Sequence, residues 1–505
     1  MSEIIVYNTL SGLKEKFTPL REGKVGIYCC GPTTYNFIHI GNGRPLVVFD
    51  TIRRYLAYKG YDVTFVSNFT DVDDKIINRA ISEGIEAGDL AARYIDEYFR
   101  DAGALGVLPA DVNPKVSEHM PEIISFVEAL VEKGMAYPLD GDVYYSIEKF
   151  GEYGKLSKRS RDDLLDGARV DVDQRKRNPG DFALWKKAKP GEPFWDSPWG
   201  PGRPGWHIEC SAMSYKYLGE SFDIHGGGAD LIFPHHENEI AQSEGRFGRP
   251  MAKYWIHNGF ITINEEKMSK SLGNFFLLRE VLEKFSGQVI RFYLLSVHYR
   301  NPLDFDDEKL TLAQKGLERL KSAVRNASAL IGEKARDADG NMYGEPADDA
   351  AAEAFLAETE LTKNQFEEAM DDDFNTALAI AALFNLVRAM NGYAAESRPS
   401  TPVLRKGLDQ LIALAAVLGL DLPDGSTTER ADPELDKGLG ILLYELGEKV
   451  TLTAALEDKM ETLLTLRQRY RKEKNFAGAD RIRDVLKSLG VTVEDTAQGP
   501  RWYKE

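Results

Sequence analysis

Alternating apolar runs and helical periodicity mark the first 70 residues as a β-α-β unit. Val25–Cys29 is a short apolar run typical of a buried strand, and apolar positions in Leu46–Tyr58 follow a helical pattern that stops at Gly60. Val63–Asn68 is rich in β-branched and aromatic residues, which predicts the next strand. A chain that begins β-α-β predicts a parallel sheet, with ligands bound at the carboxyl ends of its strands.

This pattern is interrupted between about residues 115 and 200, which we interpret as an insertion. Met120–Lys133 has helical periodicity, Asp142–Ser146 is strand-like, and Lys186–Trp195 is rich in Lys, Pro, Gly and Trp. The parallel pattern returns near Gly205 and continues through Tyr254–His257.

After Asp304 the chain becomes helical. An amphipathic helix is predicted by apolar residues at spacings of three and four, namely Leu310, Ala313, Leu317, Leu320, Val324 and Ala327. Further helices are predicted at Ala350–Ala369 and Thr376–Tyr393, with polar breaks at 332–344 and 421–428. The last segment predicts helices near 453–474 and 476–489, then two short strands around Thr492 and Trp502 joined at Gln498-Gly499. The expected fold is therefore α/β, a Rossmann-type parallel-sheet domain with an insertion, followed by a helical bundle and a small mixed α/β domain.

Composition narrows the class of protein. The 505 residues are 43% hydrophobic and 28% charged, which is typical of a multidomain soluble protein. We expect no membrane span and no targeting segment, because no apolar run reaches 18 residues and the first residues are acidic rather than basic. Three cysteines cannot form a disulfide framework, so we expect a reducing, cytoplasmic location.

The net charge of −17 argues against unspecific binding to nucleic acid, because a phosphate backbone attracts Lys and Arg. It leaves room for a local basic face, and Arg467–Lys474 is such a run. Taken alone, that run is typical of a solvated helix face.

The cysteines lie near a histidine-rich segment, which suggests a metal site. His235 and Glu239 are four residues apart in Pro234–Glu239, and His236 and Glu239 are three apart, so either pair can share a helix face. Two thiolates from Cys210 and one of the pair Cys29 and Cys30 would complete a ligand set that suits zinc. The alternative is two buried cysteines and a His-Glu pair at a helix start. Strand ends favour the metal, since Cys30 ends the first strand and Cys210 and His235 are expected where later strands end.

Two glycine-containing segments predict a nucleotide site. His39 and Asn42, at an expected helix start, can donate hydrogen bonds to phosphate oxygens, while Gly41 and Gly43 let a ligand approach the backbone. We expect His225–Asp230 to form a second loop, with Gly226, Gly227 and Gly228 for close approach and Asp230 for ribose hydroxyls.

The string Lys267-Met268-Ser269-Lys270-Ser271 adds two ammonium groups on one short segment. Lys267 and Lys270 would neutralise the negative charge that develops on pyrophosphate in a transition state. Most lysine pairs lie on solvated loops, but this particular string argues against that interpretation for Lys267 and Lys270.

These motifs together resemble those of the class I aminoacyl-tRNA synthetases, and within that class the cysteinyl-tRNA synthetase family. The resemblance covers the whole chain and is densest over residues 24–300. The segment His39-Ile40-Gly41-Asn42 resembles the His-Ile-Gly-His motif of this class, with Asn42 in place of the last histidine. The segments that carry the narrower resemblance are Cys30–Thr33, Asn68–Lys75, Gly205–Ser211, Phe222–Gly228, Phe233–Glu239 and Lys267–Asn274.

The resemblance implies one Zn²⁺ bound by Cys30, Cys210, His235 and Glu239, with Cys29 in the core and His236 in a supporting role. It also implies that Thr70, Trp206 and His225 complete a pocket for L-cysteine. A thiolate is a soft metal ligand and a serine hydroxyl is not, so zinc can discriminate between these amino acids without editing. Four protein ligands usually close a zinc site, so substrate binding would require a fifth ligand or the loosening of one.

The implied reaction attaches L-cysteine to tRNA(Cys) in two steps. The cysteine carboxylate attacks the α-phosphate of ATP, assisted by Mg²⁺, and the cysteinyl group then passes from the adenylate to a terminal ribose hydroxyl, which the class I resemblance indicates is the 2′-OH. The resemblance also implies a monomer and no membrane partner.

The implied domains follow the chain. Residues 1–114 and 201–250 form the two halves of the catalytic domain, 115–200 the inserted connective domain, and 251–304 the stem-contact region with the KMSKS loop. Residues 305–422, with Asp372–Ala377, form the anticodon-stem bundle, and 430–505 the anticodon-recognition domain. Candidate anticodon contacts are Phe476, Asp480, Asp495 and Trp502, with the Arg467–Lys474 run contacting phosphate.

Three alternative functions were weighed against this one. A cysteine:amino-sugar ligase of mycothiol synthesis would share the zinc and adenylate sites but has no use for some 200 residues after Asp304. A catalytically silent paralogue that binds RNA or metal would tend to lose signature residues such as Lys267, Lys270 and His39. A zinc hydrolase with Glu239 as its base leaves the lysine segment unexplained.

Overall fold

The computed structural model describes residues 3–159, 175–263, 266–267, 275–333, 350–396, 399–423, 433–448, 456–496 and 499–504. The chain divides into two compact units, Met1–Asp424 and Gly425–Glu505. Each unit has buried apolar clusters of its own.

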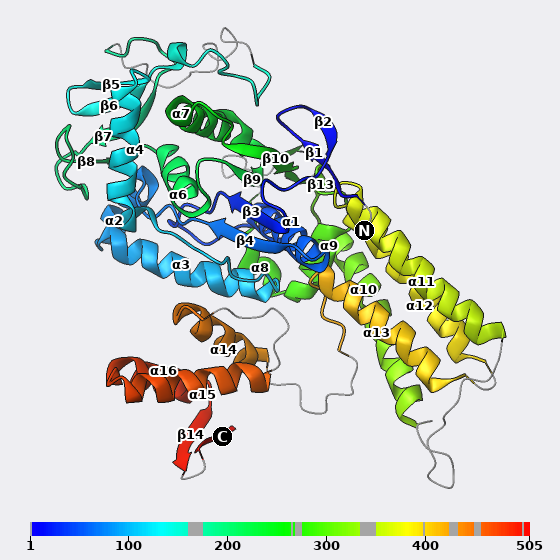
Figure 1. The fold of residues 1–505 in the computed structure, drawn as a ribbon. Helices are drawn as coiled ribbons and strands as arrows, with labels where there is room; N and C mark the ends of the chain where they lie inside the picture. The colour runs from blue at the N-terminus through cyan, green and yellow to red at the C-terminus, as the bar shows by residue number, and fades with distance from the viewer. Residues whose placement is uncertain are drawn as a thin grey trace. The chain divides into compact units, whose positions relative to one another are not determined.

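A four-stranded parallel sheet lies at the centre of the first unit (Figure 1). Its strands run in the order β10 (Ala252–Asn258), β9 (Phe222–Gly228), β3 (Lys24–Cys29) and β4 (Asp62–Ser67), and each neighbouring pair is parallel. The α1 helix (Ile40–Tyr58) connects β3 to β4. The predicted β-α-β beginning and the parallel sheet are confirmed.

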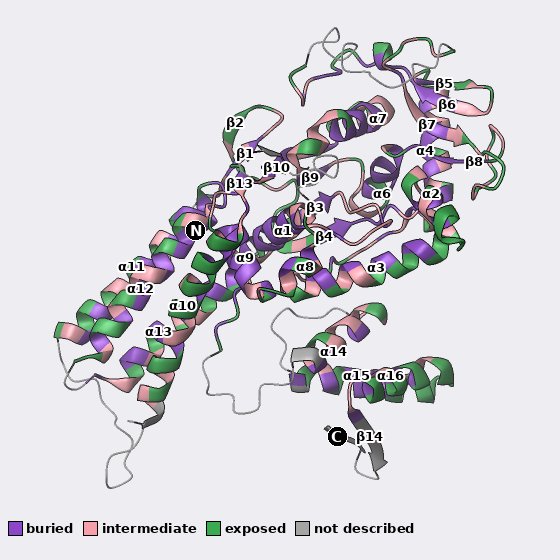
Figure 2. Cartoon of the chain, turned by 180° about the vertical axis from the view of Figure 1, so that it is seen from behind, coloured by how far each residue is buried: buried purple, intermediate pink, exposed green. Residues whose placement is uncertain are grey.

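Helices cover both faces of this sheet because successive strand residues point to opposite sides. Ile27 of β3 packs in the core that includes α1 and α9 (Gly287–Leu295). Its neighbour Tyr28 packs in the core that includes α6 (Ile208–Leu218) and α7 (Glu237–Phe247). Buried residues therefore concentrate in the strands and on the helix faces turned toward them (Figure 2).

The segment predicted as an insertion carries a second sheet. It contains α4 (Met120–Glu132) and the antiparallel strands β5 (Ala136–Leu139), β6 (Asp142–Tyr145), β7 (Phe182–Lys187) and β8 (Gly202–Pro204). The predicted helix and the strand at 142–146 are confirmed. The other three strands were not predicted. They are short, and each contains a residue type that is depleted in strands, namely Pro138 in β5, Lys186 in β7 and Gly202 in β8. Between β4 and α4 lie α2 (Asp74–Glu83) and α3 (Ala87–Ala104).

Three short strands form a small sheet downstream of β10. β11 (Ile261–Ile263) pairs antiparallel with β12 (Glu266–Lys267) and parallel with β13 (Leu303–Asp304). In the sequence, α8 (Leu278–Leu282) and α9 lie between β12 and β13. An N-terminal hairpin of β1 (Ile5–Asn8) and β2 (Leu13–Lys16) contacts β10.

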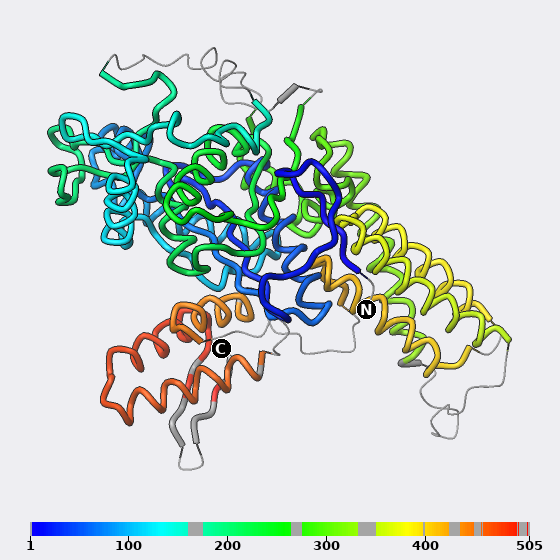
Figure 3. Tube along the Cα trace, turned by 45° about the horizontal axis from the view of Figure 1, so that its top comes forward, coloured from blue at the N-terminus to red at the C-terminus, as the bar shows by residue number. Residues whose placement is uncertain are grey.

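A helical bundle completes the first unit. It is formed by α10 (Asp307–Glu333), α11 (Ala350–Asp371), α12 (Thr376–Ala394) and α13 (Thr401–Val417), which contact one another (Figures 1 and 3). The first three helices agree with the predicted ones, whereas α13 was not predicted. Among the described residues, α12 is the one helix whose length and apolar composition would allow it to cross a membrane. Apolar residues of α12 such as Leu383 and Leu386 are buried against the other helices of the bundle.

The second unit contains α14 (Pro433–Glu445), α15 (Leu456–Lys472) and α16 (Phe476–Ser488), followed by the antiparallel pair β14 (Val491–Thr496) and β15 (Gly499–Lys504). The two predicted helices and the terminal pair of strands are confirmed, while α14 was not predicted. The run Arg467–Lys474 does not form one exposed face, because Arg467 is buried in the unit whereas Arg471 and Lys472 are exposed.

Candidate metal centre and nucleotide site

Two thiols, an imidazole and a carboxylate meet beside the parallel sheet. Cys30 follows β3 directly, Cys210 lies in the first turn of α6, and Glu239 lies in the first turn of α7. His235 belongs to the helical turn Ile232–His236 that leads into α7. One ligand atom from each of the four lies within 4.8 Å of the others. The structure therefore brings together all four predicted zinc ligands.

The separations within this quartet suit a tetrahedral metal. The Sγ atoms of Cys30 and Cys210 are 3.7 Å apart, and Cys30 Sγ is 3.4 Å from Glu239 Oε1. His235 Nε2 is 3.1 Å from the same Glu239 oxygen. Zinc bonds of about 2.3 Å to sulfur and about 2.0–2.2 Å to nitrogen or oxygen place tetrahedral ligands roughly 3.3–3.8 Å apart. The two separations from Cys30 lie in this range and the His235–Glu239 separation is slightly shorter, so the donor set fits a zinc ion once these two side chains move slightly apart.

A second set of four also meets the distance criterion for a metal, namely Cys30, His225, His236 and Glu239. His225 Nε2, however, lies 2.8 Å from Glu239 Oε2, which is the length of a hydrogen bond rather than the separation of two ligands. His236 Nδ1 lies 2.8 Å from His257 Nε2, and its other nitrogen is 3.4 Å from Cys30 Sγ. His225 thus contacts the Glu239 carboxylate, and His236 contacts Cys30 and His257.

Burial disfavours the charged forms of the Cys30 thiol and the His235 imidazole. Burial and the neighbouring Cys210 thiol raise the pKa of Cys30 well above its usual value. Burial, together with His207 and His225, lowers the pKa of His235 well below its usual value. A neutral imidazole has a free lone pair for a metal, whereas the Cys30 thiol must lose its proton to become a ligand, which a divalent cation bound beside it would favour.

The three residues predicted to bind cysteine lie around this quartet. The Trp206 ring is 40% exposed and packs on the His235 ring with centroids 4.3 Å apart. His225 is buried and reaches Glu239, as described above. Thr70 is buried, and its hydroxyl donates to Glu209 Oε2 at 2.8 Å.

Glu209 was not predicted, although it precedes Cys210 directly in the segment Gly205–Ser211. Burial raises the pKa of Glu209 well above its usual value. A glutamate in the first turn of a helix is ordinarily solvated, so only the fold reveals that this one is buried against Thr70.

Two predictions about backbone placement were wrong. Cys210 does not end a parallel strand, since it lies in α6, and the strand before it, β8, belongs to the antiparallel sheet. Gly226, Gly227 and Gly228 do not form a loop, since they are the last residues of β9 and pair with β10. Their lack of side chains serves packing, because a Cβ at Gly226 would lie 2.2 Å from Phe49 of α1.

The first nucleotide segment lies at a helix N-terminus as predicted. His39 caps α1, its Nδ1 accepts from the Asn42 N–H at 3.3 Å, and its own N–H donates to Asn42 Oδ1 at 3.2 Å. This reciprocal pair of bonds is a capping box, which places the Asn42 side chain at the N-terminus of α1. Gly41 and Gly43 belong to the same first turn of α1.

Of the other residues predicted to bind the nucleotide, the structure describes Asp230 and the backbone of Lys267. Asp230 follows β9 in the turn Ala229–Leu231, and a Cβ at Gly228 would lie 2.4 Å from Asp230 Oδ1, so this carboxylate folds over the strand end. The backbone of Lys267 is part of β12. Lys270 lies outside the described residues.

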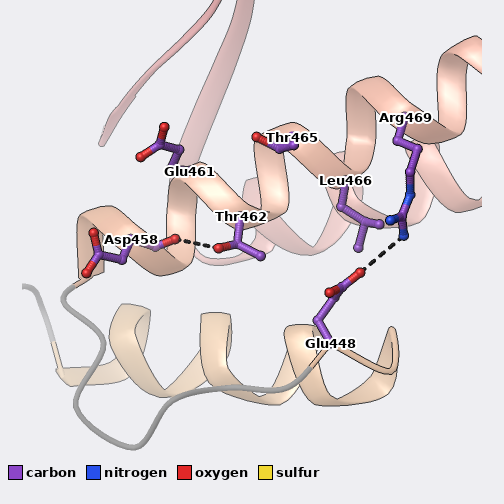
Figure 4. A pocket seen from close by; sticks show the side chains of 7 residues that line it. All are labelled: Glu448, Asp458, Glu461, Thr462, Thr465, Leu466 and Arg469. Atoms are coloured by element: carbon purple, nitrogen blue, oxygen red, sulfur yellow. Dashed lines mark hydrogen bonds and ion pairs between the residues drawn. The ribbon is translucent and has the colours of Figure 1, made fainter.

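The second unit has a shallow hollow of about 420 Å³ between α15 and Glu448 (Figure 4). Its wall carries Asp458 and Glu461, and Arg469 crosses it to pair with Glu448 at 3.1 Å. It is lined by Glu448, Asp458, Glu461, Thr462, Thr465, Leu466 and Arg469, so none of the predicted anticodon residues Phe476, Asp480, Asp495 and Trp502 forms part of it.

Three family models match the chain. The model of the tRNA synthetases class I (C) catalytic domain matches residues 16–315, that of the DALR domain residues 365–423, and that of the cysteinyl-tRNA ligase anticodon binding domain residues 453–502. Together they account for both units.

Curated relatives match over nearly their full length. The cysteine–tRNA ligase of Heliobacterium modesticaldum is 57% identical over 504 residues, covering 99% of each chain. The cysteine–tRNA ligase of Desulforamulus reducens is also 57% identical, over 502 residues and 99% of each chain.

Solved structures share the fold at much lower identity. A methionyl-tRNA synthetase of Mycobacterium tuberculosis, in complex with methionyl-adenylate, has a TM-score of 0.57 at 16% identity, covering 84% of this chain and 94% of that one. A putative arginyl-tRNA synthetase of Campylobacter jejuni has a TM-score of 0.56 at 13% identity, covering 79% and 94%. The Rossmann-type α/β fold is thus that of class I synthetases, and the full-length identity to curated relatives establishes that this ligase belongs to the cysteine–tRNA ligase family.

Proposed function

We propose that the protein attaches L-cysteine to tRNA(Cys) at the expense of ATP through a cysteinyl-adenylate. The observation that carries this proposal is the largely buried quartet Cys30, Cys210, His235 and Glu239, with ligand atoms within 4.8 Å of one another, at the carboxyl end of the same sheet that supports the His39–Asn42 helix start. Family membership supplies the reaction class, and the site supports the choice of amino acid.

The quartet would hold one Zn²⁺, and His225 and His236 would keep its carboxylate and thiol oriented. A bound zinc ion supplies a soft acceptor that favours the thiolate of cysteine over the hydroxyl of serine. Trp206, which is partly exposed and packs on the His235 ring, would flank the substrate, and Thr70 would accept or donate one polar contact. Cys210, His235 and Glu239 are buried, so water has little access to their ligand atoms, while Cys30 is partly exposed.

The ATP phosphates would be received at the N-terminus of α1. Backbone N–H groups and the helix dipole favour an anion there, and His39 and Asn42 add donors once their mutual capping bonds open. Gly226–Gly228 and Asp230, at the end of β9, would contact the nucleoside. Lys267 and Lys270, with Mg²⁺, would offset the negative charge of the departing pyrophosphate.

The helical bundle and the second unit would bind the tRNA. Phe476 is 60% exposed at the start of α16, which suits stacking on an unpaired base. Asp480 is an acceptor on the same helix, ion-paired with Arg483 at 2.9 Å. Asp495 and Trp502 are on the two terminal strands, and Lys472 and Lys474 are available for phosphate contacts. We further propose that the chain acts as a monomer in the cytoplasm.

The test is charging of tRNA by the purified full-length protein. We expect labelled cysteine, and not serine, to become attached to bulk tRNA when ATP and Mg²⁺ are present. The control is cysteine-dependent ATP–pyrophosphate exchange, which reports the adenylate step alone. Exchange without charging would indicate another acceptor, such as an amino sugar, and absence of both reactions with zinc supplied would contradict the proposal.

A further inference from the structure

A buried arginine joins the two nucleotide segments of the chain. Arg44 lies in α1, two residues after Asn42, and is fully buried. Its Nη1 donates to the carbonyl oxygens of Gly259 at 2.9 Å and Phe260 at 2.8 Å. Its Nη2 donates to the carbonyl oxygens of Asn301 at 2.5 Å and His298 at 3.4 Å.

The partners of this guanidinium are unusual for a buried charge. Among the described residues they are backbone carbonyls, and no ion pair to a carboxylate is formed. Burial lowers the pKa of Arg44 to about 10, so the group remains charged at neutral pH. An uncompensated buried cation is costly unless its geometry is fixed, which indicates that this one is kept for what it connects.

What it connects are the start of α1 and the strand that leads to the lysine segment. Gly259 and Phe260 separate β10 from β11, and β11 pairs with β12 so that Thr262 is opposite Lys267. His298 and Asn301 lie in the loop before β13, which pairs with the other edge of β11. One guanidinium therefore bonds both the connection that leads into β11 and the loop that leads into β13 to helix α1.

The far end of the lysine segment is also held against this helix start. The Leu278 N–H donates to the Ile38 carbonyl at 2.9 Å, and the Ile40 N–H donates to the Phe276 carbonyl at 3.2 Å. These bonds fix the chain after residue 274 beside His39. Arg44 supplies the corresponding attachment before residue 266. The chain on both sides of the lysine segment is therefore bonded to the start of α1.

We propose that Arg44 is a positioning residue for adenylation, which sets the strand carrying Lys267 at a fixed distance from the His39–Asn42 helix start. The inference rests on the proposed function, in which the His39–Asn42 segment and the lysine segment contact the same ATP molecule. Lysine cannot replace it, because a single ammonium group cannot span carbonyls from two loops as a planar fork does. Removing the fork should therefore weaken the contacts to ATP and pyrophosphate while leaving the cysteine site intact.

The test compares full-length Arg44→Lys with wild type in ATP–pyrophosphate exchange. A misplacement of about 1 Å at a reacting group costs roughly 100-fold in rate, so we expect kcat/KM for ATP to fall by about 10- to 100-fold. The KM for cysteine and the zinc content measured by elemental analysis should not change. Transfer of cysteine from preformed cysteinyl-adenylate to tRNA should also proceed at the wild-type rate.

The matched control is Arg53→Lys. Arg53 is buried on the same helix, and its Nη1 donates to the Pro109 carbonyl at 2.8 Å, but it contacts neither nucleotide segment. We expect this variant to keep its kcat/KM for ATP. Equal losses in both variants, or a parallel loss of cysteine affinity in Arg44→Lys, would show that Arg44 only stabilises the fold.

A second variant keeps the charge and disturbs the same junction. A Cβ at Gly259 would lie 2.6 Å from the carbonyl oxygens of Arg300 and Asn301, so Gly259→Ala should separate the two loops that Arg44 joins. We expect the same selective loss in kcat/KM for ATP, even if Arg44→Lys does not fold. Unchanged kinetics in a folded Gly259→Ala variant would overturn the proposal. Absence of exchange in the wild type would instead contradict the proposed function itself.

Discussion

Adjacent cysteines on one strand end have different surroundings, which gives the metal assignment a direct test. Cys30 faces Cys210 and Glu239, whereas Cys29 is buried in the apolar core on the α1 side of the sheet. The alternation of a strand puts neighbouring side chains on opposite faces. Only one of the two thiols can therefore belong to the metal set.

We predict that Cys30→Ala loses its bound zinc while Cys29→Ala retains it. Removing a ligand leaves three donors and lowers metal affinity, whereas removing Cys29 deletes one buried sulfur and costs about 1 kcal/mol of stability. Elemental analysis of purified protein and competition with a chromogenic chelator measure the effect. Equal zinc content in the two variants would argue against the quartet.

At the scale of elements, buried charges fasten α1 to its neighbours. Arg291 of α9 donates to Asp50 of α1 at 2.6 Å and to the Leu418 carbonyl at 2.7 Å. Arg54 also donates to Asp50, at 2.7 Å. This network joins α1, α9 and the residue that follows α13.

We predict that Asp50→Asn destabilises the first unit by about 3–5 kcal/mol, because it leaves Arg291 as a buried unpaired charge. Burial acts to raise the pKa of Asp50, but Arg54, Arg291 and Arg53 outweigh it and lower the pKa to about 2. A depressed carboxylate pKa contributes stability above its unfolded value, near 3.8, and this contribution is lost as pH falls from about 4 toward 2.

Urea unfolding of the wild type and the variant, followed by circular dichroism from pH 7 to pH 3, measures this difference. The wild-type midpoint should fall more steeply below pH 4 than the variant midpoint. A variant as stable as the wild type at pH 7 would contradict the role of Asp50.

The turn between α11 and α12 fastens the bundle to the catalytic domain in a similar way. Asp373 Oδ1 accepts from the Tyr7 N–H at 2.8 Å and the Tyr299 hydroxyl at 2.7 Å, and Asp373 Oδ2 accepts from Arg300 Nε at 2.7 Å. Asp373 and Phe374 both have positive φ, at 63° and 52°, a conformation that costs energy outside glycine. These contacts offset that strain and hold the loop of Tyr299 and Arg300, whose neighbours His298 and Asn301 bind Arg44.

At the scale of the whole molecule, the two compact units have separate cores. The second unit buries Leu439, Leu463 and Ile482 among its own residues, and the first unit buries its apolar residues in other clusters. A chain with this organisation can lose one unit without unfolding the other.

We predict that the chain ending at Asp424 keeps cysteine-dependent ATP–pyrophosphate exchange within about threefold of the full-length rate, and loses most of its charging of tRNA. The metal quartet and the α1 start lie in the first unit, whereas the proposed anticodon contacts lie in the second. The measurement is exchange and charging on the same preparation, with circular dichroism as the control for folding. Normal charging by the shortened chain would refute the assigned role of the second unit.

The sequence determined the elements with strong local signals. Val25–Cys29 and the α1 pattern predicted the parallel sheet, because a buried apolar strand followed by an amphipathic helix has few alternative arrangements. The four proposed zinc ligands were also selected before the fold was known, although the choice of Cys30 over Cys29 and of His235 over His236 came from the family resemblance. Short strands such as β5 (Ala136–Leu139) and β8 (Gly202–Pro204) were missed, because three or four residues that include a proline carry too little alternation to indicate a strand.

Only the tertiary structure decided what the buried polar residues do. The sequence marks Arg44, Glu209 and Asp373 as charged and therefore as exposed, and no periodicity shows that each is surrounded by segments tens or hundreds of residues away. It likewise placed Cys210 on a strand and Gly226–Gly228 in a loop, because local composition does not record which helix packs on a glycine. Residue types and short motifs determined the chemistry that this chain can perform. The distances that make the chemistry possible arise from long-range packing, which a linear pattern does not contain.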